Sequence, residues 1–158
     1  MKKIKLLFVC HGNICRSPMA EYRMRQMAEE AGCIHLFEIA SAATTSEELG
    51  NPVYPPVRRL LEAHGMDCSI KRARRIMLDD YAYYDMIVGM DEENRHDLLR
   101  LTHGDPDGKV SLLLDHTDPA DTMHHDRDVA DPWYTRNFDA TWDDIEHGCK
   151  ALLDKLTR

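Results

Sequence analysis

The sequence has no long apolar run, and this absence limits the classes of protein that it can encode. The stretch from Ile4 to Val9 includes a lysine, is too short for the core of a signal peptide, and is followed by Cys-His-Gly-Asn rather than by a small-residue cleavage site. No segment is long and apolar enough to span a membrane. We therefore expect a cytoplasmic location and no membrane partner.

Cysteine pairs, nucleotide-binding signatures and repeats are also missing. The five cysteines are an odd number without C-x2-C spacing, which predicts reduced thiols rather than a disulfide framework or a zinc site. There is no G-x-x-x-x-G-K-[ST] and no G-x-G-x-x-G, which argues against nucleotide-binding folds. Without repeats, low-complexity tracts or a Gly/Ser linker, the 158 residues predict one domain, 1–158.

The charge that is present is acidic and uneven. The formal net charge is −8, and 43% hydrophobic with 30% charged residues is typical of a soluble globular protein. Residues 1–75 carry 12 Lys and Arg against 8 Asp and Glu, whereas residues 76–158 carry 8 against 20. The acidic second half argues against a nucleic acid partner, because binding to a phosphate backbone depends on Lys and Arg.

The most informative stretch runs from Val9 to Pro18 and has the sequence Val-Cys-His-Gly-Asn-Ile-Cys-Arg-Ser-Pro. It joins an apolar run to a segment of good helix formers, which predicts a strand, a tight loop and a helix start. The N–H groups of His11–Arg16 can converge there in an anion-binding nest, at the positive end of the helix dipole. Gly12 is free of side-chain steric limits, and Asn13 tolerates the left-handed backbone.

Cys10 and Arg16 carry the chemistry of this loop. Arg16 presents a fork of donors suited to two phosphate oxygens. Cys10 lies at the base of the nest, where a positive field lowers a cysteine pKa from about 8.5 to roughly 3.5–7.5. It would then be a nucleophile directly beneath a bound phosphorus atom, with the Ser17 hydroxyl able to donate to the thiolate. The alternative, that Cys10 and Cys15 are only small buried residues, explains neither Arg16 nor the Gly-Asn pair.

Strands alternate with helices along the chain, which predicts an α/β fold with three layers, a four-stranded parallel sheet with helices on both faces. The expected strands are Ile4–Val9, His35–Ala40, Tyr84–Met90 and Lys109–Leu114. The expected helices are Ser17–Glu30, Val57–His64, a turn at Leu78–Tyr81, Asp91–Leu101 and one that starts at Asn137 or Asp139. Ser41–Pro52 and Asp115–Ala130 are expected to be irregular. The first strand-to-helix turn would lie at the carboxyl edge of the sheet, where open α/β sheets bind ligands.

The Cys-x5-Arg-Ser motif resembles the phosphate loop of protein tyrosine phosphatases. The fuller stretch Val9–Pro18, near the start of a short chain, resembles the low-molecular-weight protein tyrosine phosphatase family. The resemblance implies that family's phosphotyrosine phosphatase I-like fold and a reaction that needs no metal or cofactor. It implies phosphotyrosine-containing proteins as substrates and inorganic phosphate as product. We expect a monomer or a weak homodimer.

A second catalytic element follows from the same resemblance. Asp131-Pro132-Trp133-Tyr134 is similar to a late Asp-Pro-aromatic-Tyr motif of the family and implies that Asp131 is the general acid. In the implied mechanism Cys10 attacks phosphorus, while Arg16 and the loop N–H groups stabilise the equatorial oxygens. Asp131 protonates the leaving oxygen and then acts as base for the water that hydrolyses the cysteinyl-phosphate. The alternative is an ordinary Asp-Pro turn.

The resemblance also suggests how the substrate is held. The expected substrate-binding residues are His11, Gly12, Asn13, Ile14, Cys15, Ser17, Glu47, Trp133 and Tyr134. Ser41 is the expected support, because it matches the family's serine that hydrogen-bonds the loop Asn, here Asn13. Glu47 is a departure, since the family usually has an aromatic residue there. In a second departure, the family's supporting His has no match near Ser69-Ile70-Lys71.

Relatives of the same fold provide alternatives. Arginine phosphatases resemble this chain but carry Thr at the position of Ile14, whose bulk suits a phenyl ring and disfavours a guanidinium. Arsenate reductases need two further cysteines around the middle of the chain, and none lies between Cys68 and Cys149. A phosphate-binding module without turnover is disfavoured by the joint presence of the nucleophile, the arginine and the general acid.

Two further features are hypotheses. The segment before Asp131 has the residue types of a metal site, but no spacing that fixes a geometry, so we expect a solvated acidic loop and no metal site. The residues concerned are His116, Asp118, His124, His125, Asp126 and Asp128. A reversible Cys10–Cys15 disulfide that protects the nucleophile is suggested by the resemblance.

Overall fold

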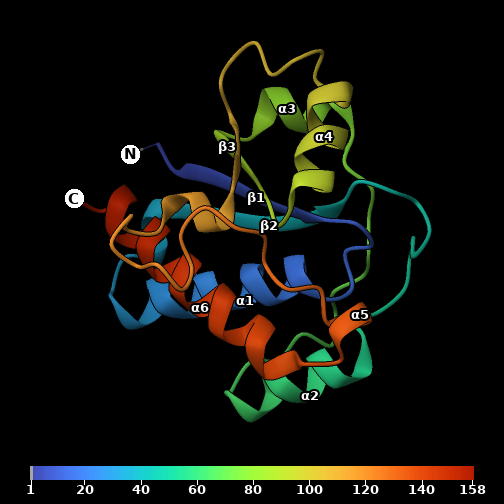
Figure 1. The fold of residues 1–158 in the computed structure, drawn as a ribbon, viewed down its shortest axis with the longest axis vertical. Helices are drawn as coiled ribbons and strands as arrows, with labels where there is room; N and C mark the ends of the chain where they lie inside the picture. Colours follow the sequence, from blue (N-terminus) through green and yellow to red (C-terminus); the bar gives the residue numbers. More distant parts are fainter. Residues whose placement is uncertain (1) are drawn as a thin grey trace.

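Four parallel strands form the centre of the computed structural model, which describes residues 2–158. In chain order, with η for 3₁₀ helices, the elements are β1 (Ile4–Cys10), α1 (Arg16–Glu30), η1 (Ile34–Leu36), β2 (Phe37–Ala43), α2 (Pro55–Ala63), α3 (Leu78–Tyr83), β3 (Met86–Gly89), α4 (Glu92–Leu101), β4 (Val110–Leu112), η2 (Leu113–His116), α5 (Pro132–Thr135) and α6 (Phe138–Leu156). The strand order is β2-β1-β3-β4, and the predicted α/β fold is confirmed (Figure 1).

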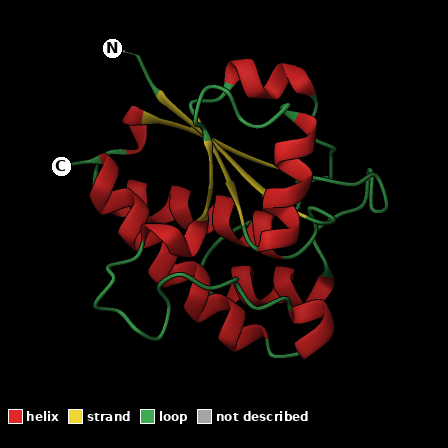
Figure 2. Cartoon of the chain, turned by 45° about the horizontal axis from the view of Figure 1, so that its top comes forward, coloured by secondary structure: helices red, strands yellow, loops and turns green. Residues whose placement is uncertain are grey.

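Helices cover both faces of the sheet, as predicted (Figures 1 and 2). The central strand β1 shows why, because its alternate side chains belong to two separate apolar clusters. Leu6 and Phe8 pack with residues of α1 and α6, and Leu7 and Val9 pack with residues of α3 and α4. All four side chains are fully buried. A strand covered on both faces needs a continuous apolar run, which is what the sequence has here.

Two of the predicted strands had wrong boundaries. The second strand starts later and ends later than predicted, because Ser41 and the two alanines after it pair in register with the last residues of β1. Ser and Ala have little intrinsic preference for strands, so pairing with the neighbouring strand determines where β2 ends. The last strand ends early at Leu112, where the Asp115 carboxylate accepts a hydrogen bond from the Leu112 N–H at 3.2 Å and the chain turns into η2.

Other boundaries shifted by one or two residues, and one helix was not expected. α2 begins at Pro55, whose missing N–H is tolerated in a first turn. The predicted turn at Leu78–Tyr81 is the helix α3. The short helix α5 starts at Pro132, directly after Asp131, whose side chain caps it. α6 follows the cap residue Asn137, one of the two predicted starts.

At Gly148, α6 packs tightly against η2. A Cβ placed there would lie 2.5 Å from Cγ of Leu113, which is fully buried in η2. We expect Gly148→Ala to destabilise the fold, because overpacking costs about 1–3 kcal/mol, more than the ~1 kcal/mol that Ala gains in helix propensity. Urea unfolding measures the change. The exposed Lys150→Ala on the same helix is the control, and a Gly148→Ala protein more stable than the parent would contradict the packing.

Candidate active site

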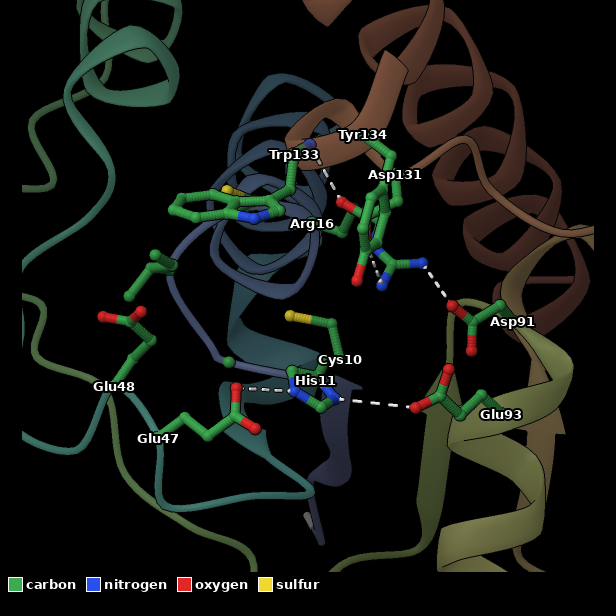
Figure 3. A pocket seen from close by; sticks show the side chains of 13 residues that line it. Cys10, His11, Arg16, Glu47, Glu48, Asp91, Glu93, Asp131, Trp133 and Tyr134 are labelled. Carbon is green, nitrogen blue, oxygen red and sulfur yellow. Dashed lines mark hydrogen bonds and ion pairs between the residues drawn. The ribbon is translucent and has the colours of Figure 1, made fainter. Parts of the chain in front are cut away.

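The loop between β1 and α1 lies at the carboxyl edge of the sheet, and a cavity of about 270 Å³ opens beside it (Figure 3). The cavity is lined by Cys10, His11, Gly12, Ile14, Cys15, Arg16, Glu47, Glu48, Asp91, Glu93, Asp131, Trp133 and Tyr134. Most residues predicted for the site are therefore together. The three that do not line the cavity, Asn13, Ser17 and Ser41, are buried behind the loop.

Asn13 fixes the shape of the loop. Its φ of 60° is the left-handed conformation that its side chain tolerates. The buried amide donates to Oγ of Ser17 at 2.8 Å and to Oγ of Ser41 at 2.9 Å, and its oxygen accepts the Arg74 N–H at 3.1 Å. The contact between Ser41 and Asn13 is the one that the sequence predicted.

Cys10 ends β1 beneath the loop. Its Sγ lies 3.0 Å from Oγ of Ser17 and accepts the Asn13 backbone N–H at 3.3 Å. Both partners are within hydrogen-bonding distance for sulfur and are positioned to stabilise a negative charge on it. The predicted contact between Cys10 and Ser17 is present.

Arg16 is the first residue of α1, and its side chain is only 3% exposed. It donates to Oδ2 of Asp91 at 2.7 Å and to Oδ2 of Asp131 at 3.3 Å. Burial lowers the pKa of Arg16, but the negative groups around it, Cys10 and the two aspartates, outweigh burial and raise it. The guanidinium is thus a fixed positive charge beside the sulfur.

Asp91 was not singled out as a site residue. The sequence indicated only that carboxylates open α4, and Asp91 does cap that helix by accepting the Asn94 N–H at 2.8 Å. Its second oxygen holds Arg16. The sequence did contain one signal, because Asp91 follows a predicted strand almost directly. The fold then places the end of that strand, β3, beside the end of β1.

Asp131 reaches the cavity from the far end of the chain. The Val129 N–H donates to the Met90 carbonyl at 2.8 Å, which places this segment beside the end of β3. Oδ1 of Asp131 accepts the Trp133 N–H at 3.0 Å, while Oδ2 faces Arg16. Its side chain is 25% exposed, so it can meet both a substrate and water.

Trp133 and Tyr134 form one wall of the cavity (Figure 3). The Trp133 ring packs at 5.2 Å between centroids against Tyr54 and is half-exposed, and Tyr134 is almost fully exposed. Ile14 is buried between this wall and the loop side of the cavity. These three residues, all expected to bind substrate, therefore border the same space.

Glutamates form the opposite rim. His11 bridges two of them, with Nε2 2.9 Å from Glu47 and Nδ1 3.8 Å from Glu93 (Figure 3). Glu48 lies against Gly12, where an added Cβ would come within 3.2 Å of its Cγ. Glu47 was predicted at the site. Glu48, the next residue in the same loop, and Glu93 were not predicted, and Glu93 reaches this rim only because the fold brings α4 there.

Lys71 lies where the sequence offers no supporting histidine. Its Nζ donates to the Ser41 carbonyl at 2.9 Å and lies 3.5 Å from Oε1 of the buried Glu21. The Ser41 hydroxyl donates to the same Glu21 oxygen. Burial lowers the pKa of Lys71. A buried ion pair thus holds Ser41, which in turn holds Asn13.

Cys15 lines the same cavity but differs in chemistry from the other cysteine of the loop. Burial, followed by the negative charges of Cys10 and Asp131, raises the pKa of the Cys15 thiol far above its usual range. Cys15 is therefore a neutral thiol.

The residues of segment 116–128 that have the chemistry of metal ligands do not form one cluster. His116 contacts Oγ of Ser111 at 2.8 Å and Nζ of Lys155 at 3.1 Å, and burial followed by the Lys155 charge lowers its pKa to about 4. Among residues 2–158, the one group of three potential ligands that comes together is His124, Asp143 and His147, which shares no residue with the cavity.

In the same described range, no helix has both the length and the apolar character needed to cross a membrane.

Comparison with known proteins gives a consistent result. The family described as low molecular weight phosphotyrosine protein phosphatase matches residues 5–158. The chain is 34% identical to the low molecular weight protein-tyrosine-phosphatase YfkJ of Bacillus subtilis over 98% of this chain and 97% of that protein. It is also 34% identical to the human low molecular weight phosphotyrosine protein phosphatase, over 95% of this chain and 94% of that protein.

Solved structures agree with the sequence comparison. The crystal structure of Bacillus subtilis YfkJ superimposes with a TM-score of 0.92 at 33% identity, covering 99% of this chain and 96% of that chain. A Drosophila arginine phosphatase superimposes with a TM-score of 0.87 at 25% identity, covering 98% of this chain and 99% of that chain. The fold is therefore shared by proteins described with different phosphorylated substrates.

Proposed function

This chain belongs to the low molecular weight phosphotyrosine protein phosphatase family, and we propose on that premise that it hydrolyses phosphotyrosine in proteins, and small aryl phosphates, through a cysteinyl-phosphate intermediate. The observation that carries the proposal is the meeting of three groups in one cavity. Cys10 lies under the loop, Arg16 is buried beside it, and Asp131 contacts Arg16 from across the cavity.

Binding places the phosphoryl group in the loop. Convergent N–H groups of the loop and the start of α1 supply a positive field for the anion. The N–H groups of Arg16 then donate to two phosphoryl oxygens, while Asp91 holds the guanidinium in place. Asp131 is held at the rim by the hydrogen bond that its carboxylate accepts from the Trp133 N–H.

The first chemical step transfers the phosphoryl group to sulfur. The Cys10 thiolate attacks phosphorus, an S–P bond forms, and the P–O bond to the phenol breaks. Asp131 gives its proton to the leaving phenolate oxygen, so that a neutral phenol departs and Asp131 becomes a carboxylate. Arg16 and the loop N–H groups stabilise the charge on the equatorial oxygens.

The second step returns the enzyme to its starting state. The Asp131 carboxylate takes a proton from a water molecule, whose oxygen attacks phosphorus as the S–P bond breaks. Inorganic phosphate forms and the thiolate is restored. Ser17, 3.0 Å from the sulfur, donates a hydrogen bond to the thiolate as it leaves. The Cys10–Cys15 disulfide stays a hypothesis beside this cycle.

Ile14, Trp133 and Tyr134 support an aryl ester over the alternatives. They border the cavity with one branched aliphatic side chain and two aromatic rings, which suits a phenyl ring better than a guanidinium. Comparing phosphotyrosine, phosphoarginine and arsenate as substrates tests the proposal directly. We expect turnover of phosphotyrosine, and activity confined to phosphoarginine or arsenate would overturn it.

The glutamate rim predicts a preference for basic peptides. Glu47 and Glu93 have side chains 67% and 72% exposed, so both can pair with Lys or Arg next to the phosphotyrosine. Exposed ion pairs are worth about 0.2–1 kcal/mol each. We therefore expect Glu47→Gln and Glu93→Gln each to reduce the ratio of kcat/KM for an Arg-flanked over an Asp-flanked phosphotyrosine peptide, by up to about fivefold.

The matched control is Glu29→Gln, at an exposed position on α1 outside the cavity. It removes the same charge and should leave the peptide ratio unchanged. The effect of the rim variants should shrink at high salt, since exposed charges are screened. A ratio that Glu29→Gln lowers as much as the rim variants do would show that net charge, not the rim, sets the preference.

A further inference from the structure

His124, Asp143 and His147 come together outside the cavity. His124 belongs to the segment between η2 and α5, drawn in orange beside α6 in Figure 1, and the other two lie on α6 itself. Nε2 of His124 is 2.7 Å from Oδ2 of Asp143, and the two imidazole rings stack with centroids 4.0 Å apart. Each residue offers a ligand atom, and these atoms lie within 4.8 Å of one another.

We propose that these three residues form a binding site for a divalent transition metal ion, with zinc as the best match. Two imidazole nitrogens and one carboxylate oxygen are ligands that zinc favours, whereas Mg²⁺ and Ca²⁺ take oxygen ligands. Asp143 and His147 are four residues apart on α6, which places them on the same face of the helix. His124 supplies the third ligand from a different segment.

Outer contacts orient both imidazole rings. Nδ1 of His124 is 2.9 Å from a carboxylate oxygen of Asp121. Nδ1 of His147 is 2.8 Å from the main-chain oxygen of Asp143. A hydrogen bond from the ring nitrogen that faces away from the ion is the usual arrangement of metal-ligating histidines. Nε2 of His124 is hydrogen-bonded to Asp143 in this structure, so zinc would take the place of the proton between these two atoms, and that proton would leave to solvent.

The exposure of the three side chains fits an entry path for an ion. His124 is 7% exposed, whereas Asp143 and His147 are 57% and 45% exposed. The buried ligand is thus fixed in advance, and the two on α6 face solvent. Three protein ligands leave a fourth position of a tetrahedral ion for water.

A bound ion would fasten the segment that ends at Asp131 to α6. Two existing contacts already join them, since Arg127 pairs with the buried Asp144 and the Ala130 N–H donates to the same carboxylate. Ligands from both elements add a further link that only the native fold provides. Binding to the folded state alone raises the unfolding temperature.

Calorimetric titration with zinc tests the site in the full chain carrying Cys10→Ser, which removes a thiolate that would itself bind zinc. We expect one equivalent to bind, and no comparable binding of Mg²⁺. His147→Ala and Asp143→Asn, both at exposed positions, should each weaken zinc at least tenfold. Asp121→Asn, which removes only an outer contact, should weaken it about 10- to 100-fold. Unchanged circular dichroism separates these losses from unfolding.

The control is His96→Ala, an exposed histidine on α4, which should leave affinity and stoichiometry unchanged. Zinc should raise the unfolding temperature of the Cys10→Ser protein but not of its His147→Ala derivative. Cobalt in place of zinc should give visible bands without a sulfur-to-metal charge-transfer band. No binding, binding that His147→Ala and Asp143→Asn leave intact, or a charge-transfer band from a thiolate would each overturn the site. These readouts need no turnover, so failure of the phosphatase proposal would not affect them.

Discussion

Replacing Cys10 by serine is expected to abolish turnover while phosphate binding persists. A serine hydroxyl is a far weaker nucleophile than a thiolate. Among residues 2–158, the side-chain and backbone groups within hydrogen-bonding distance of the sulfur are the Ser17 hydroxyl and the Asn13 N–H, and neither is a base that could activate a serine. We expect kcat for p-nitrophenyl phosphate to fall by at least about 10⁴-fold. Initial rates at saturating substrate measure it.

Phosphate binding should survive the same substitution, because the groups that hold the anion are elsewhere. Arg16 is held by Asp91 and Asp131 rather than by the sulfur, and the Asn13 N–H is the loop donor that contacts the sulfur. In the proposed mechanism the substitution also removes a negative charge from beneath the bound dianion, so phosphate should bind the variant at least as tightly. Calorimetry with inorganic phosphate measures this. Near-normal turnover by Cys10→Ser would rule out the covalent mechanism.

Cys33→Ser is the matched control for this experiment. It makes the same exchange of sulfur for oxygen at a partly exposed cysteine that does not line the cavity. We expect its kcat to remain within about twofold of the parent, as for a surface substitution away from special features. A comparable loss in both variants would point to instability rather than to the nucleophile.

The geometry of the loop from Cys10 to Arg16 could be predicted from the sequence because it is local. Cys10, Asn13 and Arg16 lie within seven consecutive residues between a strand and a helix. The positive φ of Asn13 follows from residue type, and the position of Arg16 from the start of α1. Little else in the chain is needed to bring these groups together.

Asp91 and Glu93 show where sequence reasoning stops. Both were visible as acidic residues at the start of a helix, and the helix dipole explains such residues without any site. Their contacts with Arg16 and His11 exist only because β3 pairs with β1 and ends at the same edge. The sequence does not specify which strand lies next to which, so it does not specify these contacts.

Glu21 and Lys71 illustrate a related limit. The sequence showed that a supporting histidine is missing but not what replaces it. The structure places a buried ion pair there, 3.5 Å long, under the hydroxyl that holds Asn13. The pairing of Glu21 with Lys71 cannot be seen in the sequence, because the two residues are 50 positions apart and meet only in the folded chain. His124 was named among the possible metal ligands of its segment, but Asp143 and His147, which lie beside it on α6, were missed for the same reason.

Replacing Asp131 by asparagine is expected to slow catalysis in proportion to how poor the leaving group is. Asparagine keeps the shape, and its side-chain oxygen can still accept the Trp133 N–H, but it cannot give a proton to the departing oxygen. General acid catalysis contributes about 10²–10⁴-fold. We expect kcat/KM for phenyl phosphate to fall by that range, and for p-nitrophenyl phosphate by much less, because p-nitrophenolate leaves without a proton.

A series of substituted phenyl phosphates makes this test specific. The dependence of log kcat/KM on the pKa of the leaving phenol should be steeper for Asp131→Asn than for the parent, because negative charge then builds up on the departing oxygen. Asp126→Asn, an exposed change in the same segment, is the control and should leave the slope unchanged.

The alternative role of Asp131 predicts a different result. If its carboxylate served only to hold Arg16, whose guanidinium it meets at 3.3 Å, Asp131→Asn would disturb the stabilisation of every phosphoryl group alike. All leaving groups would then slow by the same factor, and phosphate binding would weaken. A proton donor instead changes the slope and leaves binding intact, because Asp91 still holds Arg16 at 2.7 Å. The slope therefore decides whether Asp131 transfers a proton or only positions a charge.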